Sequence, residues 1–204
     1  MVKDGYYYGF GLFAVAGLAW VLIHSRTATG VPILLALFFL WFFRDPDRTV
    51  PTGENLVVSP ADGKVTECEW IETQQGSKLR ISIFLSVFDV HVNRTPIAGT
   101  VTGVDYRKGG FMNAMKPESV MFNEQTLVVV NDGRVEVAFK MIAGLLARRI
   151  VCNVRQGDKL ERGQRMGLIK FGSRVDVLLP GDAQLLVKKG MRVKGGSSVL
   201  ATLA

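Results

Sequence analysis

Residues 166–179 read Met-Gly-Leu-Ile-Lys-Phe-Gly-Ser-Arg-Val-Asp-Val-Leu-Leu. They contain two apolar, strand-like segments, Met166–Phe171 and Val175–Leu179, with the dipeptide Gly172-Ser173 between them. Gly-Ser pairs usually mark turns. One interpretation is therefore an ordinary turn. The other is a peptide bond that is meant to break and to leave a new reactive group behind.

Segments rich in β-branched residues recur through the C-terminal three quarters of the chain, with turn residues between them. Asn131-Asp132-Gly133 predicts a tight hairpin turn between two of these segments. Short segments at this spacing are typical of an all-β domain. Besides the two segments around Gly172-Ser173, we predict strands at 56–58, 80–87, 100–106, 126–130, 135–142, 150–154 and 185–187.

Residues 154–163 and 187–196 form an internal repeat. In both copies two glycines stand six residues apart, and an apolar residue follows three positions after the first glycine. Paired hairpins of this kind resemble the barrel-sandwich hybrid of lipoyl and biotinyl carrier domains, which predicts a mainly β, barrel-sandwich-hybrid-like domain. Two unrelated glycine-turn hairpins are the alternative.

The N-terminal region has two apolar runs, Tyr6–Ile23 and Val31–Phe43, joined by a polar loop at His24–Gly30. A membrane span needs about 20 apolar residues, with a lower limit near 17. The first run is long enough and the second is short. A signal peptide or a buried core helix is the alternative, but a second apolar run follows at once and neither run has a polar stripe.

We therefore predict three regions: a membrane-anchoring helical hairpin at 1–43, a linker at 44–55 and a β-rich catalytic domain at 56–204. Arg44 and Arg48 follow the second run directly, so the positive-inside rule places the β-rich domain on the cytoplasmic side of the cell (inner) membrane. The formal net charge of +7 favours an anionic lipid surface.

Other partners and cofactors find little support in the sequence. No run of Lys and Arg is longer than two, so nucleic acid is not a predicted partner. Cys68 and Cys152 lie far apart without metal-ligand spacing, and we predict no metal. Both cysteines are expected to be reduced, buried small hydrophobes, which is consistent with a cytoplasmic domain.

His91 is the only histidine outside the apolar N-terminal region. It lies in a polar cluster that ends an apolar strand, so it is the natural carrier of a proton near neutral pH. Asp62 stands in a Ser-Pro-Ala-Asp-Gly turn. Together with Ser173, these residues could form a relay in which the histidine activates the hydroxyl and the acid orients the histidine. Spacing alone supports this weakly, because most Asp-Gly pairs are only turns.

Five motifs, taken in order from about residue 42 to the end, resemble the phosphatidylserine decarboxylase family in its short, archaeal-type form. Two features depart from the longer members. Arg94 stands where they carry a second histidine, and Arg174 follows Ser173 where they usually have threonine. The motifs are Phe-Phe-Arg-Asp-Pro (42–46), Ser-Pro-Ala-Asp-Gly (59–63), Asp-Val-His-Val-Asn-Arg (89–94), Ile-Ala-Gly-Leu-Leu-Ala-Arg-Arg-Ile (142–150) and Phe-Gly-Ser-Arg-Val-Asp (171–176).

The resemblance implies a self-processing proenzyme. Ser173 Oγ, activated by His91 with Asp62 behind it, would attack the carbonyl of Gly172. The products would be a β chain, residues 1–172, and an α chain, residues 173–204, with a covalent pyruvoyl group made from Ser173. A Schiff base with the lipid's serine amine would then convert phosphatidylserine to phosphatidylethanolamine and CO2, with His91 returning the proton.

Substrate contacts and alternatives stay open at this point. Arg94 is the better candidate for an anionic headgroup, and Lys108 lies in a basic, glycine-containing loop that could reach it or could be plain solvated loop. A homodimer is one option. A non-enzymatic, lipoyl-like membrane adaptor is an alternative function, although residues 179–183 carry no lysine for a lipoyl group. A decarboxylase of a related aminophospholipid is another.

Overall fold

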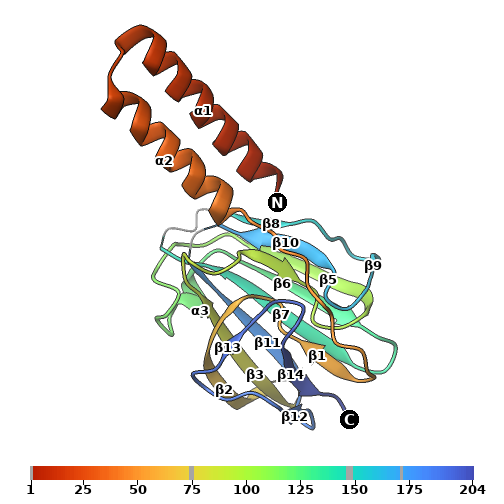
Figure 1. The fold of residues 1–204 in the computed structure, drawn as a ribbon. Coiled ribbons are helices and arrows are strands. Elements are labelled where there is room, and N and C mark those ends of the chain that lie inside the picture. Colours follow the sequence, from red (N-terminus) through yellow and green to blue (C-terminus); the bar gives the residue numbers. More distant parts are fainter. Residues whose placement is uncertain (1, 74–75, 146–148, 171) are drawn as a thin grey trace. The chain divides into compact units, whose positions relative to one another are not determined.

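The computed structural model describes residues 2–73, 76–145, 149–170 and 172–204. The chain divides into two compact units, Met1–Asp47 and Arg48–Ala204. The first is helical and the second is mainly β (Figure 1). The predicted fold class, a mainly β domain that follows an apolar helix pair, is therefore confirmed.

The helical unit is an antiparallel pair, α1 (Lys3–Ile23) and α2 (Arg26–Phe42). Tyr8 of α1 packs on Phe39 of α2, and a side chain at Gly9 would collide with Leu40, so the helices approach closely. By length and composition α1 could cross a membrane, whereas α2 has only 17 residues.

The loop between these helices is shorter than the sequence predicted. His24–Gly30 was the expected loop, but α2 already begins at Arg26. The physical reason is Ser25, whose hydroxyl accepts the Ala28 N–H and caps the helix two residues after α1 ends. A polar side chain therefore starts the helix at a place where polarity suggested a loop.

The β unit contains fourteen strands and one short helix, α3 (Ser119–Phe122), within its described residues. Most predicted strands are present, some with shifted ends. The strands are β1 (Leu56–Val58), β2 (Gly63–Thr73), β3 (Gly76–Leu85), β4 (Val92–Arg94), β5 (Gly99–Arg107), β6 (Gln125–Asn131), β7 (Glu136–Ala143), β8 (Ile150–Cys152), β9 (Lys159–Leu160), β10 (Arg165–Ile169), β11 (Ser173–Pro180), β12 (Gln184–Leu185), β13 (Arg192–Val193) and β14 (Val199–Thr202).

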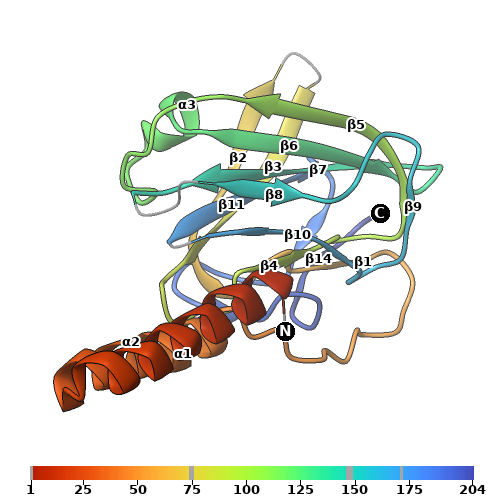
Figure 2. The ribbon, with the colours of Figure 1, turned by 90° about the horizontal axis from the view of Figure 1, so that it is seen from above.

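Eight of these strands form one curled sheet in the order β13-β2-β3-β11-β7-β6-β5-β9. Two three-stranded sheets, β1-β14-β12 and β4-β10-β8, complete the unit. Figure 2 shows β5, β6 and β7 running side by side along the sheet. Alternate residues of the central strands point into the core, where Ile81, Phe139, Val175 and Val177 are fully buried. β11 therefore lies in the middle of the sheet with a partner on each side.

The eight-stranded sheet consists of two equivalent halves that meet between β11 and β7. β13, β2, β3 and β11 correspond to β9, β5, β6 and β7, and the two small sheets correspond to each other. The repeat predicted from the sequence explains part of this symmetry. Gly157 and Gly190 have φ angles of 94° and 96°, and their N–H groups donate to Val101 O and Val65 O, both at 2.8 Å. The two copies of the repeat are thus structurally equivalent.

A second repeat, 59–66 (Ser-Pro-Ala-Asp-Gly-Lys-Val-Thr) and 95–102 (Thr-Pro-Ile-Ala-Gly-Thr-Val-Thr), emerges only with the structure. The N–H of Arg94 donates to Pro60 O, and the N–H of Val58 donates to Pro96 O, both at 2.9 Å. Such reciprocal contacts are what a two-fold relation produces. The Ser-Pro-Ala-Asp-Gly turn is consequently bonded to β4, which directly follows His91.

We expect Gly99→Ala to lower the free energy of unfolding by about 3 kcal/mol or more, since a Cβ there would lie 2.4 Å from Asn131 O at a φ of 155°. Gly157→Ala is the matched control, because its φ is also positive but no atom lies within 4 Å. It should cost about 1 kcal/mol. Guanidinium-induced unfolding in detergent measures the free energy of unfolding of both variants. Equal losses of stability in the two would contradict the predicted clash with Asn131 O.

Candidate active site

The Gly172-Ser173 pair lies at the start of the central strand. Gly172 has a φ of 62°, in the left-handed region that favours glycine. Ser173 is the first residue of β11 and pairs with Leu85 of β3 and Ala143 of β7. Its side chain is fully buried, and its Oγ has no hydrogen-bond partner within the described residues. A buried hydroxyl without a partner is costly, and chemistry is one reason to keep one.

His91 contacts the residue that precedes this serine. Its Nε2 lies 3.2 Å from the N of Gly172 and accepts that N–H. Its Nδ1 lies 2.9 Å from the carbonyl oxygen of Asp89. A carbonyl can only accept, so Nδ1 carries the proton and the lone pair of Nε2 faces Gly172. His91 as a whole is 2% exposed. The structure thus brings His91 and the Gly172-Ser173 pair together.

Asp89 holds His91 in this orientation through its backbone. Its carboxylate accepts the N–H and the hydroxyl of Ser86 at 2.8 and 2.7 Å, and it pairs with Arg192 at 3.0 Å. These contacts close the turn at 86–89 and fix the carbonyl that receives Nδ1–H. The sequence analysis did not assign this residue a role. The Ser-x-x-Asp spacing, in which polar side chains bond to a nearby backbone, was the available signal.

Gly144 is a second residue that sequence reasoning missed. It directly follows β7, and a Cβ built on it would lie 2.1 Å from the carbonyl oxygen of Gly172. Real Cβ atoms essentially never come so close. Only glycine therefore lets this backbone lie against the carbonyl that a serine attack would require. No signal in a single sequence separates this glycine from those in turns.

The described hydrogen bonds of the Asp62 side chain go to residues other than His91. Its carboxylate accepts from Nη2 of Arg48 at 2.7 Å and from the N–H of Gly195 at 2.8 Å. The predicted relay needs a hydrogen bond between Asp62 and His91, and the described part of the chain contains none. Asp62 instead joins the start of the β unit to the turn before β14.

The two predicted headgroup residues lie in different surroundings. Arg94 is buried, and its Nη1 donates to the carbonyl of Gly163 at 3.1 Å. It therefore contacts the backbone of the first repeat. Lys108 is exposed in the loop that follows β5. Neither position is among the residues that contact His91 or Gly172 through a described hydrogen bond.

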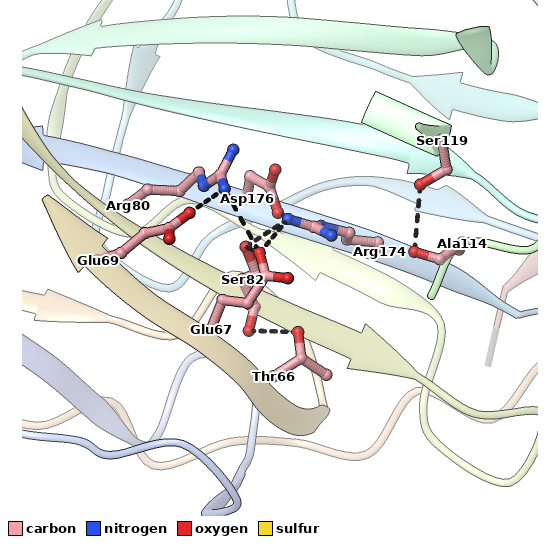
Figure 3. A network of polar contacts seen from close by, with 9 residues as sticks. All are labelled: Thr66, Glu67, Glu69, Arg80, Ser82, Ala114, Ser119, Arg174 and Asp176. Carbon is pink, nitrogen blue, oxygen red and sulfur yellow. Dashed lines mark hydrogen bonds and ion pairs between the residues drawn. The ribbon is translucent and has the colours of Figure 1, made fainter. Parts of the chain in front are cut away.

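A partly buried charge network surrounds the residue after Ser173 (Figure 3). The guanidinium of Arg174 pairs with Asp176 at 2.6 Å and Glu67 at 2.8 Å, and donates to Ser82 Oγ at 2.8 Å. Burial alone would lower the pKa of Arg174, but Asp176 and Glu67 outweigh it and raise that pKa. This network holds β11 to β2 and β3 one residue beyond the candidate cleavage site.

Burial affects other groups in this unit as well. It lowers the pKa of Lys140 on β7, although Asp176 acts in the opposite direction. Cys68 and Cys152 are free and partly buried, and burial raises the pKa of both thiols. They pack against the core as small hydrophobes, less completely buried than the sequence suggested.

Comparison with known proteins now identifies the family. The model of the family described as phosphatidylserine decarboxylase matches residues 35–201. The chain belongs to the phosphatidylserine decarboxylase family. A protein of Solibacter usitatus called phosphatidylserine decarboxylase proenzyme is 50% identical over 98% of this chain and 96% of its own length. One of the same description from Symbiobacterium thermophilum is 46% identical over 100% and 95%.

The family match confirms the resemblance drawn from the five motifs. Because the chain covers almost the full length of these relatives, the helical region and the β unit both lie within the comparison. Relatives described as proenzymes are also consistent with a buried serine that has no partner among the described residues and that follows a glycine bonded to a histidine. The non-enzymatic adaptor is therefore the weaker of the two function classes.

In Gly144→Ala, we expect cleavage at Gly172-Ser173 to slow by at least roughly tenfold, because the added methyl displaces the Gly172 carbonyl. Gly133→Ala is the control, since it has a positive φ and open space around it. Denaturing gels after expression follow the conversion, and circular dichroism checks folding. A wild-type cleavage rate in folded Gly144→Ala would show that the close approach is irrelevant.

Proposed function

We propose that this chain is a self-processing decarboxylase that converts phosphatidylserine to phosphatidylethanolamine and CO2. The observation that carries the proposal is a buried Ser173 hydroxyl without a partner among the described residues, next to Gly172, whose N–H donates to His91 Nε2 at 3.2 Å. The names of the relatives support the substrate and the proenzyme state. A related aminophospholipid with another headgroup is the alternative substrate.

In the first step, His91 Nε2 takes the proton of the Ser173 hydroxyl. Oγ attacks the carbonyl carbon of Gly172, a C–O bond forms and the C–N bond to Ser173 breaks. The proton passes to the freed amine, so an amide becomes an ester without change in composition. The Nδ1–H bond to Asp89 O keeps the imidazole in the tautomer this step needs.

The ester then breaks by elimination. A base removes the Cα proton of residue 173, the Cβ–Oγ bond breaks, and Gly172 leaves as a C-terminal carboxylate. Water replaces the nitrogen on the remaining fragment, and ammonia is released. Residue 173 becomes a pyruvoyl group at the start of chain 173–204, and chain 1–172 is the other product.

The residues around Ser173 fit such a group. The position is buried, its polar atom lacks a described partner, and a cavity of about 340 Å³ reaches Gly172 between Phe84 and Ala114. Once formed, a pyruvoyl carbonyl provides an electron sink for an amine substrate that loses CO2. This chain's own contribution would be His91 as the proton donor and acceptor, and a largely apolar cavity beside Gly172.

The two product chains would stay together through the sheets. β11 lies between β3 and β7, β13 pairs with β2, and β14 pairs with β1. Each of these pairs joins residues 173–204 to residues 1–172. The ion pair between Arg174 and Glu67 crosses the same boundary. Cleavage would therefore leave the ladder contacts from residue 174 onward in place.

We propose different roles for the remaining predicted residues. Asp62 positions the turn that is bonded to β4, and Arg94 holds the backbone at Gly163. Lys108 stays a candidate for the lipid surface. α1 supplies membrane attachment, and Arg44 and Arg48 place the β unit on the cytoplasmic side under the positive-inside rule.

Ser173→Ala should leave the chain uncut, because no hydroxyl is present to attack Gly172. Intact-mass measurement of wild-type protein should give two chains, the smaller without a free N-terminal amine, and Ser173→Ala should give one. Ser77→Ala, an exposed serine, is the matched control and should cleave normally. A single uncut chain from active wild-type material would falsify the self-processing proposal.

His91→Ala should abolish cleavage, since no other described group reaches Gly172 N–H with a basic nitrogen. Asp62→Asn should cleave more slowly than wild type but faster than His91→Ala, because an amide oxygen can still accept the Gly195 N–H. Cleavage rates, measured on gels with pulse-labelled protein, distinguish wild type, Asp62→Asn and His91→Ala. Loss in Asp62→Asn as complete as in His91→Ala would instead indicate that the Asp62 charge acts in the relay.

A further inference from the structure

Two cavities adjoin at the candidate active site. One, of about 340 Å³, contains Gly172 and is lined mainly by apolar side chains. The other, of about 420 Å³, contains Arg174 and the lysines Lys64 and Lys189. Phe84 and Ala114 line both, so the two share a wall. A ligand that spans them would meet an apolar region and a cationic region side by side.

Three large apolar side chains on these cavities face solvent. Phe88 is 73% exposed, Met115 61% and Leu145 65%. Phe88 and Leu145 line the cavity at Gly172, and Met115 lines the neighbouring one. Single exposed apolar residues are common and need no explanation. Three of them around two adjoining cavities, one of which reaches Gly172, are a different case.

The charge of the second cavity comes mainly from its lysines. Arg174 is neutralised there by Asp176 and Glu67. Lys64 and Lys189 are exposed, and the described residues give neither an ion-pair partner. Two exposed cations beside an apolar surface match a glycerophospholipid, whose phosphodiester lies next to its acyl chains.

We propose that this surface, formed by Phe88, Met115, Leu145, Lys64 and Lys189 and called here the lipid face, docks on a phospholipid bilayer. The apolar side chains enter the acyl region, and the lysines pair with lipid phosphates. The inference rests on the proposed function in one respect: a docked lipid face would bring a substrate to residue 173 without the lipid leaving the bilayer.

Two of the segments that carry the lipid face, those of Phe88 and Met115, are held in place before any docking. Phe88 lies in the 86–89 turn that Asp89 closes. Met115 lies in a loop whose ends are joined by Asn123, whose side chain bonds to Met112 N, Met112 O and Ala143 O at 2.7–2.8 Å. Docking would therefore require little ordering of these two segments, which lowers its entropic cost.

A photocrosslinking experiment on the unmodified full chain tests the proposal. The probe is a phospholipid with a diazirine in its acyl chain, mixed into phosphatidylcholine–phosphatidylglycerol vesicles that hold the protein. We expect labelled peptides to cover 84–90, 112–116 and 142–145, with α1 as the internal positive control. Residues 154–163, at the far end of β5, serve as the negative control. Labelling of α1 without the first three segments overturns the proposal.

A pair of substitutions tests the energetics. Leu145→Asp and Met115→Asp together should lower the ratio of turnover on vesicle phosphatidylserine to turnover on monomeric short-chain phosphatidylserine by about tenfold or more. Leu186→Asp, an exposed leucine outside both cavities, is the matched control and should leave the ratio unchanged. If the double variant leaves the ratio of vesicle to monomeric turnover unchanged, bilayer docking is overturned.

The outcomes separate the two proposals. Labelling at the lipid face without any decarboxylation supports docking and removes the proposed function. Decarboxylation without labelling at the lipid face supports the proposed function and overturns docking. A second copy of the chain could cover this face instead. Acyl labelling at the lipid face would then be absent, and the detergent-solubilised protein would be a dimer that Leu145→Asp disrupts. This result also overturns bilayer docking.

Discussion

The pairing of β11 on both of its edges is the constraint on which the rest of the structure depends. Its ladders to β3 and β7 fix the backbone from Ser173 onward. A bond at the very start of such a strand can be cut while the ladder contacts from Arg174 onward stay in place. Arg174 strengthens the same place, because its ion pairs lie within one strand and across to β2. The fold is therefore suited to a break at the position where the proposed reactive group would form.

The same place concentrates features that do not help stability. Gly172 has a left-handed φ, Ser173 Oγ is buried without a described partner, and Gly144 leaves no room for a side chain. Features of this kind persist only where the surrounding structure determines them strongly. Here the surroundings are a fully buried apolar core and a paired strand. Unfavourable backbone and hydrogen-bonding features are confined to this small region, and the surrounding strands have ordinary packing and pairing. This distribution is expected of a functional site.

Much of this could be read from the sequence, because the signals are local. β-branched runs gave most strands, Asn131-Asp132-Gly133 gave the β6–β7 turn, and His91 stood out as the only histidine of the β unit. The misses depend on long-range contacts. Asp62 lies with Arg48 and Gly195 because a turn from another repeat comes near it. Spacing cannot show this, nor that a carbonyl, rather than a carboxylate, receives the His91 Nδ1–H.

The two-fold arrangement explains how one half acquires a site that the other lacks. β7 and β11 are equivalent, adjacent and antiparallel, so the end of one lies beside the start of the other: Ala143 pairs with Ser173. The residue after β7 must then face the residue before β11, which puts Gly144 against the Gly172 carbonyl. The repeat itself supplies this juxtaposition. In the proposed mechanism, His91, on the segment that leads into β4, makes this juxtaposition reactive, so the proposed chemistry depends on one departure from an otherwise symmetrical framework.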